Sequence, residues 1–122
     1  MPVVMIYVQH LLGIGHLMRA RLIAEALADA GSDVHLVSGG MPIGGRMPRG
    51  VRIVQLPPIR VSDASFMPLR DGDYVPIDEG YRTTRRDMLL ATFDALDRFA
   101  YEHKRPLTLP LVREWLQRRL GS

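Results

Sequence analysis

The residues best suited to chemistry form a short glycine-rich stretch, Gly13-Ile14-Gly15-His16. An apolar run precedes this stretch and a helical pattern follows it, so we expect a turn between a strand and a helix. Glycines let such a turn be tight and let the backbone approach a ligand closely. The N–H groups that open the helix, with the positive end of its dipole, favour phosphate or a developing negative charge. We therefore expect Gly13 and Gly15 to belong to an anion-binding loop.

His16 stands at the start of the expected helix. The positive helix end disfavours a protonated ring, so we expect a neutral imidazole that can accept a proton. Such a group beside an anion-binding loop suits a general base that activates a hydroxyl. From position alone, a histidine that only caps the helix or packs is an equal alternative. We expect His10 and His35 to be structural and His103 to be exposed, and the four histidines show no metal-ligand spacing.

Three further residues are candidate ligand contacts. Arg19 follows the glycines by about one helical turn and could bind a phosphate, although an exposed helical arginine is the commoner outcome. Gly39 and Gly40 follow the second expected strand. They would lie at the carboxyl edge of the sheet, where open α/β sheets bind ligands. An ordinary turn is an equally good interpretation of this pair.

Hydropathy patterns predict the elements that position these residues. Residues 3–9 are almost continuously apolar, as in a parallel strand covered on both faces. A helix is expected over residues 16–30 and is ended by Gly31. Its apolar stripe consists of Ala20, Ile23, Ala24 and Leu27. Short strands are expected at 34–37 and 51–56. Strand, helix and strand in this order imply a right-handed crossover, hence an α/β, Rossmann-like parallel sheet flanked by helices.

The remainder of the chain is expected to be less regular. Residues 57–80 carry four prolines and five of the thirteen acids, which is typical of a long irregular connection. A second helix is expected over residues 81–100. Its apolar face consists of Leu89, Phe93, Leu96 and Ala100. Thr108 could cap a short final helix.

Arginines gather at the start of this second helix, at Arg82, Arg85 and Arg86. Cations at a helix N-terminus oppose the dipole, which is a mild hint of an external anion. Solvated surface side chains remain the favoured interpretation. The sequence thus divides into an α/β region, residues 1–100, and a basic helical tail, residues 101–122.

Composition limits the classes of function. The chain has 122 residues, no cysteine and a net charge of +3, so disulfides and thiolate metal sites are excluded and a reducing compartment is favoured. No apolar run approaches the ~20 residues that span a bilayer, and we expect a cytoplasmic protein. The basic tail could meet phosphate or an anionic membrane surface, although a solvated helix face is favoured. The basic residues of the tail are interleaved with a single aromatic residue, Trp115, and no nucleic-acid motif appears, so no nucleic-acid partner is expected.

The segments around the glycine turn resemble the start of GT-B-fold glycosyltransferases. The resemblance is carried by residues 4–20, 24–27, 35–40, 51–58 and 85–90. Among these enzymes, the chain looks most like bacterial glycosyltransferases related to family 28, which includes the N-acetylglucosaminyltransferase of peptidoglycan synthesis. The shared motifs are the Gly-x-Gly-His turn and the Ser-Gly-Gly strand end.

This resemblance implies a domain that binds the acceptor of a sugar, beside a cleft to a second domain. His16 would be the base that activates the acceptor hydroxyl, and Gly13 and Gly15 would face the cleft. The family needs no metal and no organic cofactor. The nucleotide-sugar donor is a substrate that binds mainly to a second, C-terminal domain.

The family's pattern does not continue beyond about residue 96, where further strands and the donor-binding domain would follow. We therefore expect the acceptor-binding half of a glycosyltransferase, as a truncated product, a fragment or one subunit beside a separate donor-binding subunit, inactive alone. The alternative is a non-catalytic, anion-binding Rossmann-like module or partner subunit. A dinucleotide site is disfavoured because Met18 occupies the place of the third fingerprint glycine and no acid follows the second strand.

Overall fold

The computed structural model describes residues 1–45, 48–62 and 68–106. Its elements, in chain order, are β1 (Val3–Val8), α1 (Gly15–Asp29), β2 (Asp33–Ser38), β3 (Val51–Gln55) and α2 (Glu79–Glu102). The three strands form one parallel sheet in the order β1-β2-β3, with β2 in the centre. The predicted α/β, Rossmann-like arrangement is therefore confirmed. The final helix expected after Thr108 lies outside the described residues.

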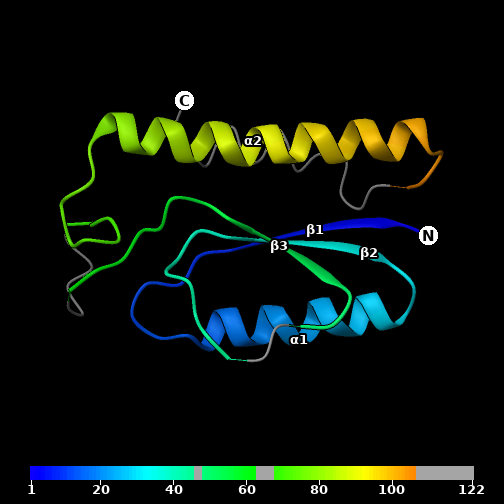
Figure 1. Cartoon of the computed structure of the whole chain (residues 1–122), viewed down its shortest axis with the longest axis horizontal. Helices are drawn as coiled ribbons and strands as arrows, with labels where there is room; N and C mark the ends of the chain where they lie inside the picture. The colour runs from blue at the N-terminus through cyan, green and yellow to red at the C-terminus, as the bar shows by residue number, and fades with distance from the viewer. Residues whose placement is uncertain (46–47, 63–67, 107–122) are drawn as a thin grey trace.

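The two helices cover opposite faces of the sheet (Figure 1). Successive strand side chains point to opposite faces. On one face, Val4 of β1 and Val34 of β2 pack with Ala24 of α1. On the other face, Val3 packs with Leu96 of α2. Since both faces are buried, the near-continuous apolar run of β1 is explained.

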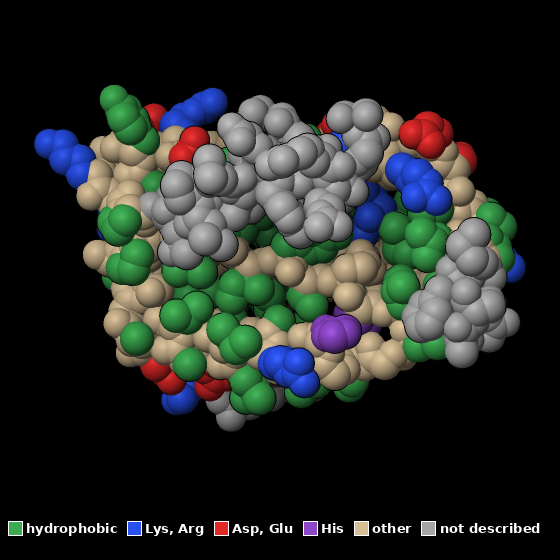
Figure 2. All heavy atoms as spheres, turned by 180° about the vertical axis from the view of Figure 1, so that it is seen from behind, with side chains coloured by type: hydrophobic (Ala, Val, Ile, Leu, Met, Phe, Trp, Pro, Cys, Tyr) green, Lys and Arg blue, Asp and Glu red, His purple; other side chains and the backbone are tan. Residues whose placement is uncertain are grey.

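Helix α1 buries a narrow stripe made of Leu17, Ala20 and Ala24. The expectation for Ile23 was wrong, because its side chain is 50% exposed and Leu22 is 70% exposed. Figure 2 shows hydrophobic side chains gathered on the face turned away from the viewer in Figure 1. Gly31 has φ +99°, so it ends α1 in the left-handed conformation that glycine adopts without strain.

Helix α2 begins at an N-cap, Asp78, whose side chain accepts a hydrogen bond from the backbone N–H of Tyr81 at 2.8 Å. Such a cap satisfies one of the free donors of the first turn. The buried face contains all four predicted apolar residues, and Arg85 extends it by one turn towards the N-terminus. The 24-residue helix runs two residues further in each direction than the expected 81–100.

The described part of the connection from β3 to α2, residues 56–62 and 68–78, is irregular, as predicted. Its only pairings within the described part of the connection are isolated antiparallel bridges from Arg70 to Arg60 and to Pro76. After α2 the chain returns to the sheet, where the N–H of Val3 donates to the carbonyl of Pro106 at 2.9 Å. Neither helix in the described ranges is long and apolar enough to cross a membrane.

Candidate functional site

An open pocket of about 460 Å³ lies where β1 ends and α1 begins. It is lined by Gln9, Leu11, Leu12, Gly13, Gly15, His16 and Arg19. Four residues predicted from the sequence, at positions 13, 15, 16 and 19, thus meet at one cavity. Its place at the carboxyl end of a parallel strand is where open α/β sheets hold ligands.

The side chain of His16 is exposed and belongs to the first turn of α1. Ile14 is the N-cap of this helix; among the described residues no side chain caps it, and the first turn contains no acid. The free N–H groups and positive dipole of the helix are therefore not neutralised by a neighbouring carboxylate of that turn. This environment suits a negatively charged or hydroxyl-bearing ligand group next to an imidazole.

Gly13 and Gly15 act through the space that they leave open. Neither has a positive φ, so the turn does not depend on a backbone conformation restricted to glycine. A Cβ at either position would meet nothing within 4 Å. Since both glycines line the pocket, a larger side chain there would fill space that a ligand could use.

Gly39 and Gly40 are buried and do not line this pocket. A Cβ on Gly39 would contact the Gln9 amide oxygen and would lie 2.6 Å from Nη2 of Arg85. A Cβ on Gly40 would lie 2.5 Å from the ring of His10. The structure thus gives the pair a packing reason for being glycine, and ligand binding by them remains a prediction.

Arg85 is the residue that sequence analysis missed. The expectation of a solvated side chain was wrong, because Arg85 is 7% exposed. Its Nε donates to the carbonyl of Pro57 at 2.6 Å. Its Nη2 donates to Gln9 Oε1 at 2.8 Å and to the carbonyl of Gly39 at 3.0 Å. One guanidinium from α2 therefore joins the segments that follow all three strands.

Gln9 connects this guanidinium to the pocket. Its side chain lines the pocket, its Oε1 accepts from Arg85, and its Nε2 donates to the carbonyl of His10 at 3.0 Å. These bonds fix the direction of the chain as it leaves β1. The position of the glycine turn therefore depends on a contact between residues 76 positions apart.

His10 is buried just after β1, in agreement with its expected structural role. Neither ring nitrogen has a hydrogen-bond partner among the described residues. Burial lowers the pKa of His10; the Met41 backbone opposes this in part, and the charge of Arg21 adds a smaller lowering. His10 is therefore held as a neutral ring and does not line the pocket.

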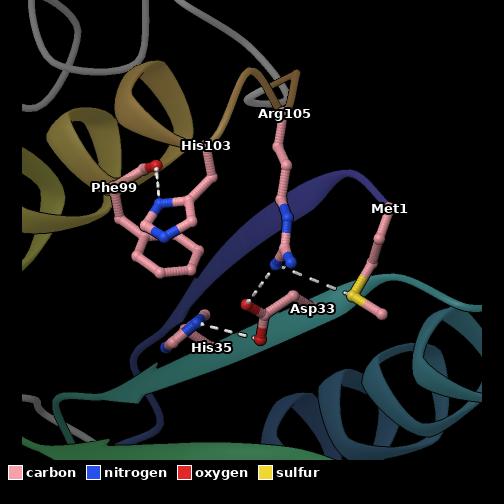
Figure 3. Close-up of polar contacts among 6 residues, drawn as sticks. All are labelled: Met1, Asp33, His35, Phe99, His103 and Arg105. Atoms are coloured by element: carbon pink, nitrogen blue, oxygen red, sulfur yellow. Dashed lines mark hydrogen bonds and ion pairs between the residues drawn. The ribbon is translucent and has the colours of Figure 1, made fainter.

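A second group of titratable side chains lies towards the amino ends of the strands, opposite the carboxyl ends that hold the pocket (Figure 3). Asp33 Oδ1 lies 3.2 Å from His35 Nε2, and its Oδ2 lies 3.8 Å from Arg105. His103 is exposed and stacks on Phe99 with ring centroids 4.1 Å apart. These contacts join the end of α2 to the start of β2, so the group has a structural role.

Within the described ranges, no group of three or more His, Cys, Asp or Glu side chains could hold a metal ion. No protein-family model matches the chain, and a search of curated proteins finds no match either.

Proposed function

We propose that this chain is the acceptor-binding half of a glycosyltransferase that moves a sugar from a nucleotide-sugar donor to an acceptor hydroxyl. The observation that carries the proposal is the open pocket shared by Gly13, Gly15, His16 and Arg19. The resemblance of the surrounding segments to GT-B-fold enzymes supports the same interpretation. The pocket volume of about 460 Å³ is within the range of small-molecule sites, ~300–1,000 Å³.

In this proposal, His16 is the general base. Its ring takes the proton of the acceptor hydroxyl while the hydroxyl oxygen attacks the anomeric carbon of the sugar. The bond from that carbon to the nucleoside diphosphate breaks, and the configuration at the carbon inverts. Arg19 and the uncapped start of α1 hold an anionic group of the acceptor. A separate donor-binding half holds the nucleotide.

The test supplies a donor-binding half in trans and measures sugar transfer to candidate acceptors. We expect His16→Ala to lower the rate by ~100-fold or more, the usual size of a general-base contribution. His103→Ala is the matched control, because this histidine is also exposed but lies beyond the far end of α2. Equal turnover in His16→Ala and wild type would show that His16 is not the general base.

The second candidate is a non-catalytic module that binds anions at the same pocket. The uncapped N-terminus of α1 beside Arg19 favours it, because both attract negative charge without any need for a base. The two candidates differ in one result. The non-catalytic module is favoured if Arg19→Gln weakens anion binding and no donor-binding half supports sugar transfer.

A further inference from the structure

A smaller cavity, of about 150 Å³, lies on the α2 side of the sheet. Three arginines from the first two turns of α2, Arg82, Arg85 and Arg86, line it together with Tyr7 of β1. Buried apolar side chains, Leu56, Ile59 and Leu89, complete the lining. Among the residues that the structure describes, no acid lines it. The cavity therefore gathers positive charge and hydrogen-bond donors over an apolar base.

The charge of Arg85 is buried and has no carboxylate partner among the described residues. Its three hydrogen bonds go to two backbone carbonyls and one amide oxygen, all of them neutral. No ion pair of Arg85 is formed with any residue in the described ranges. Burying an unpaired charge is costly, and the positive end of α2 adds to the cost. An anion bound in the cavity would reduce the cost of the buried charge and the cost added by the helix end.

Hydrogen-bond donors remain available around the cavity. Within the described part of the chain, the guanidinium of Arg82 and Nη1 of Arg85 make no hydrogen bond; the backbone N–H of Arg82 donates to the carbonyl of Asp78 within the helix. Arg86 lies 3.6 Å from Asp87, its neighbour in the helix, whose side chain is 65% exposed. An exposed pair of this kind contributes little and is easily exchanged. Among the described residues, the Arg82 guanidinium and Nη1 of Arg85 therefore have donors available for a ligand, and Arg86 has only its exposed neighbour to exchange.

The size and chemistry of the cavity identify the class of ligand. Its volume is about half the lower end, ~300 Å³, of sites for drug-sized molecules, so one small charged group fits better than a whole nucleotide. The planar fork of arginine matches the oxygens of phosphate and can bind them in pairs. We propose that this cavity binds a phosphate group, either inorganic or carried by a small molecule.

Of the described residues, none lines both this phosphate site and the pocket of His16. The hydrogen bond from Arg85 to Gln9 connects the two cavities, because each of these residues lines one of them. The site is independent of sugar transfer. Variants of Arg19 alter the pocket of His16 alone, whereas variants of Arg82 and Arg86 alter the phosphate site alone.

The test is calorimetric titration of the full chain with inorganic phosphate at low salt, followed by pyrophosphate and acetate. Arg82→Gln and Arg86→Gln are the informative variants, since neither side chain is needed in the core. Arg98→Gln is the matched control, an exposed arginine near the other end of α2. Arg19→Gln reports on the pocket of His16.

We expect saturable phosphate binding that each of Arg82→Gln and Arg86→Gln weakens by ~10-fold, equivalent to ~1.4 kcal/mol. Arg98→Gln and Arg19→Gln should leave the affinity unchanged, and acetate should bind more weakly than phosphate. In nuclear magnetic resonance spectra, phosphate should shift the Nε–H signal of Arg85. Lack of saturation, an equal loss in Arg98→Gln, a loss only in Arg19→Gln, or acetate binding as tight as phosphate would each overturn the proposal.

Discussion

At the scale of single residues, Arg85 determines how the carboxyl edge of the sheet is held. Its guanidinium donates to acceptors that follow β1, β2 and β3. Removing it leaves two carbonyls and one amide oxygen without their charged donor in a buried place. Hydrogen bonds to charged groups contribute more than neutral ones, and unpaired buried groups are costly.

We predict that Arg85→Ala lowers the free energy of unfolding by about 3 kcal/mol. Urea denaturation followed by circular dichroism measures this. The matched control, Arg98→Ala, removes an exposed arginine from the same helix and should change stability by less than ~0.5 kcal/mol. Equal stabilities of the two variants would show that Arg85 does not hold the edge.

Substitution of Gly39 should change the stability of the fold much more than substitution of Gly13. A Cβ at Gly39 overlaps Gln9 and Arg85, whereas a Cβ at Gly13 meets open space. We predict that Gly39→Ala destabilises the fold by ~1–3 kcal/mol, as overpacking does, and that Gly13→Ala changes stability by less than ~0.5 kcal/mol. The same denaturation measurement compares them. A Gly13→Ala variant as unstable as Gly39→Ala would contradict the described geometry.

Two buried histidines make stability depend on pH. Burial is the main cause that lowers the pKa of both His10 and His35 below its ordinary value of about 6.5, although Asp33 opposes this at His35. The unfolded chain then binds protons at a higher pH than the folded chain, so stability rises with pH across this range. The stability that these neutral histidines contribute is fully present above about pH 6.5. It is lost as the pH falls through their lowered pKa values in the folded state.

We therefore predict a lower urea midpoint at pH 5.5 than at pH 7.5. The double variant His10→Gln, His35→Gln should lose part of this difference, because glutamine does not titrate. An unchanged pH dependence in the double variant would assign the effect to other groups.

At the scale of elements, α2 depends on the cap at Asp78. We predict that Asp78→Ala destabilises the protein by ~1 kcal/mol, because the N–H of Tyr81 loses its acceptor. Thermal unfolding measures this. Asp97→Ala, an exposed acid near the end of the same helix, should cause no loss. A loss of the same size in both variants would indicate a general effect of charge.

Helices and strands were predictable from the sequence where apolar residues recur in a regular pattern. Leu89, Phe93 and Leu96 recur at helical spacing, and the structure buries them as expected. The apolar run of β1 predicted a strand covered on both faces. Helix α1 was harder, because it is apolar on several sides, and Ile23 points to solvent while Leu17 is buried.

At the scale of the whole molecule, contacts between distant segments could not be predicted. Arg85 lies at the helical spacing of the buried face of α2, one turn before Leu89. That spacing could have suggested burial, but its charge favoured a solvated position. Its acceptors lie 28, 46 and 76 positions away, and nothing in a single sequence relates such residues. The pocket of His16 was predictable because its residues are local to one turn.

The proposed general base requires His16 to be open to solvent in its pocket, whereas His10 and His35 are buried. Carbethoxylation of the full chain, followed by mass spectrometry of each histidine, measures this directly. The structure predicts fast reaction at His16 and His103, which are exposed, and slow reaction at His10 and His35, which are 4% and 8% exposed. Reaction at His16 as slow as at His10 would contradict the open pocket and, with it, the proposed base.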